Sequence, residues 1–174
     1  MTEKRLLKMG NPILREIAKP IKNFNTPELY QLIEDMKDTM VANDGAGLAA
    51  IQIGILKRVI IFGFKQNPRY PQSPAIPLTV LINPQYTSLD NEIESGWEGC
   101  LSVPGMRGLV PRFKKIQYSG YDVLGKKITR EVSDFHARVV QHELDHLDGL
   151  LYVDKIEDHA NFGFTQELEL ANAY

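Results

Sequence analysis

The sequence has one cysteine, Cys100, among its 174 residues, which excludes an internal disulfide framework. No apolar run approaches the roughly 20 residues of a membrane-spanning helix. The opening segment, MTEKRLLKMGNPILR, also lacks an apolar run long enough for a signal peptide. These absences predict a cytoplasmic protein that has no membrane partner.

Neither sign of charge is in large excess. Lys and Arg number 20, Asp and Glu number 22, and the net charge is -2, so nothing indicates direct binding to nucleic acid. Hydrophobic residues at 43% and charged residues at 24% are ordinary for a globular protein. A chain of this length can bury a sizeable core, so we expect a single domain over residues 1–174.

Two helices are predicted. In NTPELYQLIEDMKDTM, Thr26 is a suitable N-cap and Pro27 suits the first turn. The apolar residues of this segment share one stripe, which we assign to the core: Leu29, Leu32, Ile33, Met36 and Met40. The second helix should begin near Ser133 and Asp134, both good caps, and stop at Gly149.

Several strands are predicted as well. Arg58–Phe64 and Leu78–Pro84 are β-branched and apolar, as buried strands are. The proline-rich segment between them, residues 65–77, is expected to be an irregular surface loop. The segments KKIQYSGYDV and KITREVS flank Leu124-Gly125 and predict a hairpin.

The second helix contains QHELDH. An α-helix turns every ~3.6 residues, so His142 and His146 lie on one face, where two imidazoles can bind one transition metal. Glu143 follows His142 directly and lies close enough to a metal bound there to transfer a proton. The alternative is a solvated helix with incidental histidines. However, this helix is apolar on two sides, which predicts burial, and buried histidines on one face need a common partner. One side carries Phe135 and Val139 beside the histidines, and the other carries Ala137, Val140, Leu144 and Leu147.

A catalytic metal usually has three protein ligands and one open position. Cys100, in WEGCLSVPG, follows Gly99, and a thiolate with two imidazoles suits zinc or ferrous iron. The alternative for a lone cysteine is a small buried residue. His136 points off the metal face, and His159 lies in a polar stretch typical of the surface.

The segment GAGLAAIQIG contains a glycine pair. It lacks the lysine and third glycine of nucleotide-binding loops, so we expect a tight turn and no nucleotide. Its Gln52 is a neutral amide donor that could polarise a carbonyl oxygen.

Three segments, GAGLAAIQ, EGCLSVP and QHELDHLDG, resemble the three signature motifs of peptide deformylases, in order and at suitable separations. GNPILREIAKPI resembles the opening of that family. The combination of EGCLS with HELDH is highly specific. The resemblance implies an α+β fold with antiparallel sheets packed around a central helix that carries the HELDH motif. It also implies removal of the N-formyl group from the initiator methionine of nascent polypeptides, with release of formate.

The resemblance further implies roles for individual residues. Cys100, His142 and His146 would hold one divalent metal, natively Fe²⁺, with Zn²⁺, Ni²⁺ or Co²⁺ as substitutes. Glu143 would be the catalytic acid–base, and Gln52 with the backbone N–H of Leu101 would bind the oxyanion. Residues expected at the substrate are Gly45, Ala46, Gly47, Glu98, Gly99, Phe135 and Val139. In this set Glu98 would support the site by hydrogen bonding, and the last two would form an apolar wall for methionine.

The expected partners are an N-formylmethionyl peptide and the ribosome. The C-terminal NFGFTQELELANAY departs from the basic helix common in that family and leaves peptide access and ribosome contact open. One alternative is a zinc endopeptidase, in which His159 or Glu157 would be the third ligand. Another is a metal-stabilised binding module without turnover, against which the presence of Glu143 and Gln52 argues.

Overall fold

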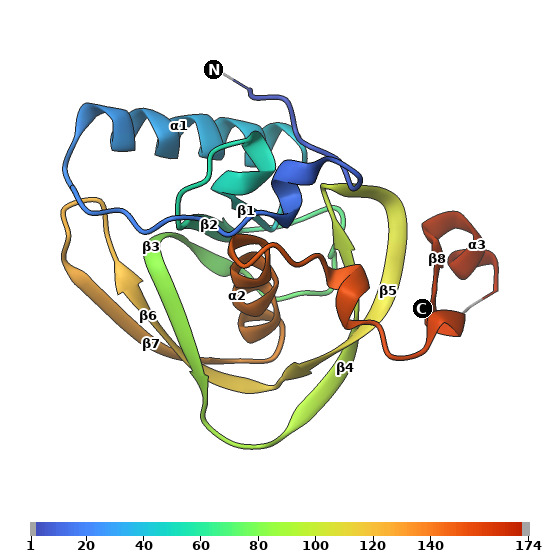
Figure 1. Ribbon diagram of the computed structural model, residues 1–174. Coiled ribbons are helices and arrows are strands. Elements are labelled where there is room, and N and C mark those ends of the chain that lie inside the picture. The colour runs from blue at the N-terminus through green and yellow to red at the C-terminus, as the bar shows by residue number, and fades with distance from the viewer. Residues whose placement is uncertain (1–2, 172–174) are drawn as a thin grey trace.

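The computed structural model describes residues 3–171 and has an α+β architecture (Figure 1). One antiparallel sheet has the strand order β1-β2-β3-β6-β7, and a second has the order β4-β5-β8. The strands are β1 Gly47–Ala49, β2 Val59–Phe64, β3 Ile76–Ser88, β4 Ile93–Cys100, β5 Val103–Phe113, β6 Lys115–Tyr121, β7 Lys127–Ser133 and β8 Phe162–Phe164. The helices are α1 Pro27–Ala42, α2 Asp134–Leu147 and α3 Thr165–Leu170, and short 3₁₀ turns are Pro12–Arg15, Ala50–Ile53, Tyr152–Lys155 and His159–Asn161.

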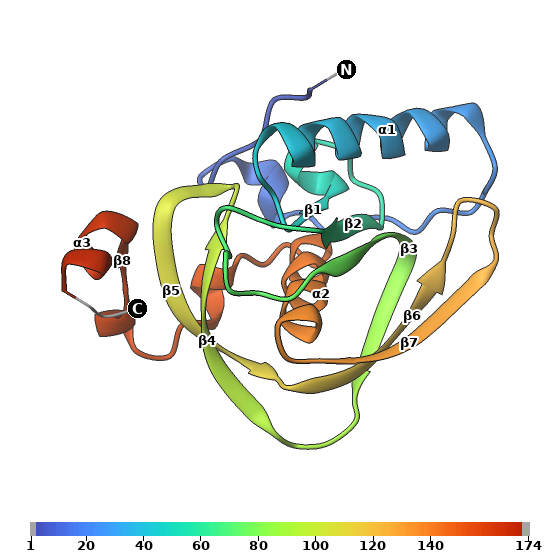
Figure 2. The same ribbon diagram turned by 180° about the vertical axis from the view of Figure 1, so that it is seen from behind.

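The larger sheet is covered by a helix on each face. Figures 1 and 2 show α2 enclosed by the strands and α1 lying across the outside of β1 and β2. Along β2, Val59 and Ile61 pack with the α1 residues, whereas Ile60 and Phe62 pack with the α2 residues. Because both faces of this strand are buried, its sequence is a continuous apolar run and does not alternate. The expected α+β fold around a central helix is confirmed.

Helix α1 follows its prediction. The Thr26 hydroxyl oxygen accepts the N–H of Leu29 at 3.3 Å, which caps the first turn. All five residues of the apolar stripe are buried. This stripe forms the outer core with the larger sheet.

Helix α2 also follows its prediction in place and burial. The residues of its second apolar side are between 0% and 5% exposed. Its cap differs from expectation, because the Ser133 side chain makes no capping bond and donates instead to the Asp134 carboxylate at 2.6 Å. Since β7 ends at Ser133 and α2 begins at Asp134, the chain turns within one residue, and Asp134 adopts a φ of 55°.

The proline-rich segment 65–77 is only in part an irregular surface loop. Strand β3 begins at Ile76, Asn67 is 5% exposed, and the Tyr70 ring packs on Phe135 with centroids 4.8 Å apart. Prolines interrupt hydrogen-bonded structure, but they do not prevent neighbouring side chains from being buried. The prediction of a surface loop was therefore wrong for Asn67, which is buried, whereas Tyr70 is half-buried.

At the end of the chain, β8 pairs with β5, and both views place β8 and α3 on the outer side of β5. The final three residues of the C-terminal tail, like residues 1 and 2, lie outside the described residues. Within residues 3–171 no helix is long and apolar enough to cross a membrane.

Candidate metal centre

Cys100 at the end of β4 meets His142 and His146 of α2. One ligand atom from each of these residues lies within 4.8 Å of the others, and no other such group of His, Cys, Asp or Glu occurs in residues 3–171. The Cys100 Sγ is 3.3 Å from His146 Nε2. A thiol with two imidazoles is a donor set suited to zinc and ferrous iron. These residues fit a metal ion.

The environment of Cys100 favours the thiolate, which is the form that binds metals. Burial alone would raise the pKa of this thiol, but the adjacent His146 and His142 outweigh burial and lower the pKa well below its usual value. The Ser102 N–H lies 3.4 Å from the sulfur and the Gln52 Nε2 lies 3.5 Å from it. The sulfur therefore sits among donors that stabilise a negative charge.

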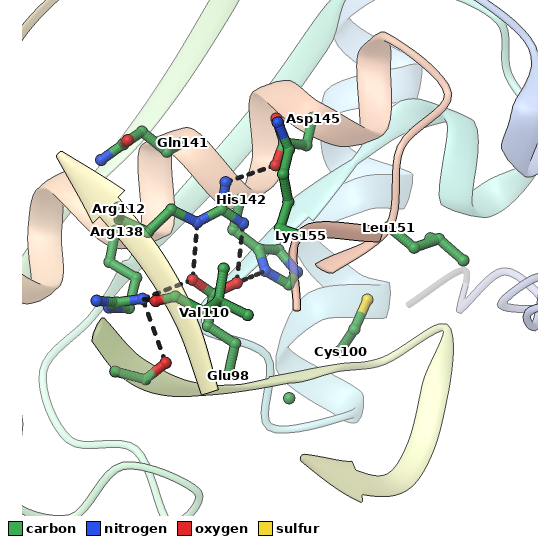
Figure 3. Close-up of polar contacts among 12 residues, drawn as sticks. Glu98, Cys100, Val110, Arg112, Arg138, Gln141, His142, Asp145, Leu151 and Lys155 are labelled. Carbon is green, nitrogen blue, oxygen red and sulfur yellow. Dashed lines mark hydrogen bonds and ion pairs between the residues drawn. The ribbon is translucent and has the colours of Figure 1, made fainter. Parts of the chain in front are cut away.

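Glu98 orients the first histidine. Its Oε2 is 2.8 Å from His142 Nδ1, which leaves Nε2 as the ligand atom. Arg112 donates to both carboxylate oxygens, from Nε at 2.8 Å and from Nη2 at 2.9 Å, and Arg138 donates to Oε1 at 2.9 Å (Figure 3). Burial opposes ionisation of Glu98, but Arg112 and His142 prevail and hold its pKa far below the ordinary range. Glu98 is thus an ionised hydrogen-bond acceptor for His142.

Glu143 has a different environment. Its side chain is 4% exposed, and its Oε2 has no hydrogen-bond partner among the described residues. Burial raises its pKa to about 7, against the effect of His142 and His146. Such a carboxyl can both take and return a proton near neutral pH. Gly47 makes room for it, because a Cβ at that position would lie 2.4 Å from Glu143 Oε1.

Gln52 belongs to the short helix after β1 and is 1% exposed. Its Oε1 accepts the N–H of Ala49 at 2.8 Å, and its Nε2 donates to Ser102 Oγ at 3.1 Å. These bonds direct the amide N–H groups toward the cysteine. The segment was expected to be a tight turn and is instead a short strand followed by a helical turn. The segment nevertheless holds the Gln52 amide in place through these two bonds.

These residues, apart from His146, line one pocket. Most residues expected at the substrate lie in its wall: Ala46, Gly47, Glu98, Gly99, Phe135 and Val139, together with Gln52, Cys100, Leu101, His142 and Glu143. Gly45 does not line the pocket, because it lies against the Met40 side chain at the end of α1.

The wall also contains four residues that the sequence analysis did not identify. They are Arg69, Tyr70, Trp97 and Arg138. Arg138 could have been identified from the sequence, because it is a charged residue one turn before His142 in a helix predicted to be buried. Arg69 and Tyr70 could not have been identified in this way, because they lie far from the motifs in sequence.

The other candidate ligands lie elsewhere. Glu157 and His159 are exposed and do not belong to the ligand group. His136 packs between the rings of Phe62 and Tyr118, with centroid distances of 5.6 Å and 5.9 Å. The alternative third ligands of a zinc endopeptidase are therefore not brought to the two histidines.

Comparison with known proteins gives a consistent result. Residues 3–162 match the family model described as polypeptide deformylase. Peptide deformylase 2 of Ralstonia nicotianae is 58% identical over 94% of this chain and 92% of its own length. Peptide deformylase 1 of Bordetella pertussis is 56% identical over 94% of this chain and 93% of its own length.

Solved structures agree with these relatives. The Met-Ala-Ser-bound class I type b peptide deformylase from Acinetobacter baumannii superposes with a TM-score of 0.86 at 40% identity, covering 90% of this chain and 100% of that one. Peptide deformylase from Thermotoga maritima gives a TM-score of 0.80 at 35% identity, covering 91% of this chain and 100% of that one.

Proposed function

Because this chain belongs to the polypeptide deformylase family and removes the N-formyl group from nascent polypeptides, we propose that the reaction occurs at Cys100, His142 and His146. The observation that carries this proposal is the convergence of the three ligand atoms, within 4.8 Å of one another, beside a pocket that Cys100 and His142 line together with Glu143 and Gln52. We also propose that residues 1–174 form one catalytic domain.

The three residues hold one divalent metal, with Fe²⁺ as the native ion and Zn²⁺, Ni²⁺ or Co²⁺ as substitutes. When bound, such an ion supplies a nucleophile at neutral pH by lowering the pKa of water toward ~7, and it polarises a carbonyl oxygen. The Glu98 carboxylate keeps the His142 ring oriented for ligation through its 2.8 Å contact with Nδ1.

Glu143 carries the proton. Its carboxylate takes a proton from the attacking water and delivers it to the leaving amine of the formamide, and a pKa raised to about 7 suits both steps. Its buried Oε2 is available for this exchange. As charge develops on the formyl oxygen, Gln52 Nε2 and the N–H of Leu101 donate to it. The two bonds that already hold the Gln52 amide mean that little reorganisation is needed.

Substrate binding follows from the wall of the pocket. Phe135 and Val139 form the apolar side for the methionine side chain, and Ala46, Gly47 and Gly99 leave the backbone accessible beside it. The peptide-bound Acinetobacter baumannii structure supports a peptide as the bound molecule here. The wider setting is the cytoplasm, with the ribosome as a partner that presents the nascent chain.

The test is hydrolysis of formyl-Met-Ala-Ser by protein prepared with Fe²⁺ without oxygen, measured as formate release. Chelation should abolish the activity, and Fe²⁺, Ni²⁺ or Co²⁺ should restore it. Acetyl-Met-Ala-Ser is the matched control, and an internal peptide bond should stay intact, in contrast to an endopeptidase. Full activity in metal-free protein would contradict the proposal.

A further inference from the structure

Arg138 has a buried guanidinium for which the reaction has no direct use. Its side chain is 9% exposed. Its Nη2 donates to the Glu94 carbonyl of β4 at 2.6 Å, and its Nη1 lies 2.7 Å from the Val110 carbonyl of β5. The same Nη1 is 3.3 Å from the Gly96 carbonyl and 2.9 Å from Glu98 Oε1. One side chain of α2 is therefore bonded to two strands of the smaller sheet, β4 and β5.

Strand β4 is shaped around this guanidinium. A Cβ on residue 96 would lie 2.8 Å from both Cζ and Nη2 of Arg138, and real Cβ atoms do not approach so closely. Glycine at this position opens the slot through which Arg138 reaches the carbonyl groups. This slot matters for the site because Cys100 lies further along the same strand, beyond Glu98.

Arg138 and Arg112 divide the task of holding Glu98. Arg112 of β5 donates to both carboxylate oxygens of Glu98, with N–O distances of 2.8 Å and 2.9 Å. Arg138 bonds to Oε1 from α2, whereas His142, four residues later on the same helix, contacts Oε2 (Figure 3). Residues four apart lie on the same helical face. The carboxylate is thus tied to the helix that bears the imidazole in two ways: directly by Arg138, and through Arg112, which also donates to Asp145 of α2 at 2.5 Å.

We propose that Arg138 is a positioning residue of the metal centre. It holds Glu98 and the two strands against α2, and in this way it sets the orientation of the His142 ring and the separation between Cys100 and the histidines. The inference rests on the proposed metal centre and extends it to a residue that contacts neither metal nor reacting atoms. Groups that orient metal ligands typically change metal affinity or activity by about 10–100-fold when they are lost.

The direction in which metal affinity changes when Arg138 is replaced distinguishes a positioning role from a purely electrostatic one. Removal of a positive charge near a cation site should strengthen metal binding if only Coulomb interactions matter. Loss of positioning should weaken metal binding. A variant of Arg138 therefore tests two explanations that predict opposite changes.

The experiment is titration of metal-free protein with Co²⁺ against a competing chelator, followed by the Co²⁺ absorption bands. Arg138→Met should weaken Co²⁺ binding by about 10–100-fold. Glu98→Gln should weaken it as well. The double variant should lose less Co²⁺ affinity than the sum of the two single losses in free energy, because Arg138 acts in part through Glu98.

Arg58→Met is the matched control. Arg58 bonds to Asp148 at the end of α2, at 2.6 Å, and does not touch Glu98, so its loss should leave Co²⁺ affinity unchanged. If circular dichroism shows that Arg138→Met does not fold, Arg138→Lys replaces it in the cycle. Lysine keeps the charge but loses the two-pronged geometry, and about 10-fold weaker binding is expected.

Wild-type or tighter Co²⁺ binding by a folded Arg138 variant would overturn the proposal. So would losses from Arg138 and Glu98 that add in free energy. Because the titration does not measure deformylation, failure of the positioning role is distinct from failure of the catalytic roles. Failure of the wild-type protein to bind Co²⁺ would overturn the metal centre and this inference together.

Discussion

Glu98 Oε2 lies 2.8 Å from His142 Nδ1, and this contact joins the two parts of the site. Glu98 belongs to β4, two residues before Cys100, and His142 belongs to α2. Since the ionised carboxylate only accepts, Nδ1 must carry the proton, and the lone pair of Nε2 remains for the metal. One hydrogen bond thereby selects the tautomer and aligns the elements that supply the ligands.

Glu143→Gln should bind one metal ion per chain while turnover falls by about 10²–10⁴. Glutamine has nearly the same shape but cannot take a proton from water. The measurement combines metal analysis with kcat on formyl-Met-Ala-Ser. Glu157→Gln, at an exposed position outside the pocket, is the control and should behave as wild type. A Glu143→Gln protein that loses metal yet keeps its rate per bound ion would disprove this role.

Gln52→Leu should lower kcat by about 10²–10³ with a much smaller change in KM, because the donor acts mainly as charge develops on the formyl oxygen. Leucine has a similar size and no donor. Steady-state kinetics on protein of verified metal content checks this. A near-normal kcat would mean that Gln52 serves only packing and its bond to the Ala49 N–H.

Gly47→Ala should fold and bind metal but turn over poorly. The new Cβ would lie 2.4 Å from Glu143 Oε1, so the carboxylate must move, and a misplacement of about 1 Å can cost ~10²-fold in rate. The matched control is Gly163→Ala, whose Cβ would meet nothing closer than 3.6 Å. Equal activities of these two variants would show that Glu143 tolerates displacement.

The Fe²⁺ form should lose activity in air, whereas Ni²⁺ or Zn²⁺ forms should persist. A thiolate that lines an open pocket is within reach of oxygen or peroxide and can pass to sulfenic or sulfinic acid. Cys100 is the only cysteine in the sequence, so no intramolecular disulfide can protect it. Mass spectrometry of the inactivated protein should find the modification on Cys100, in parallel with metal loss. Inactivation with Cys100 reduced and Fe²⁺ still bound would refute this explanation.

The sequence determined the features that depend on local periodicity. The spacing of His142 and His146 puts both on one helical face, and the buried stripes of α1 and α2 follow from the same 3.6-residue repeat. The continuous apolar run of β2 likewise indicates a strand covered on both faces. Strands β4 and β5 escaped prediction, because their glycine, proline and charged residues show neither alternation nor an apolar run.

The tertiary structure alone decided which distant groups meet. The sequence suggested Cys100 as a ligand through a family resemblance, but only the pairing of β4 with β5 beside α2 brings its sulfur within 3.3 Å of His146. Arg112 and Arg138 lie 26 residues apart, yet both bond to the Glu98 carboxylate. Such contacts depend on how a strand pair docks on a helix, and that docking is set by packing of the whole core and not by the pattern of any one segment.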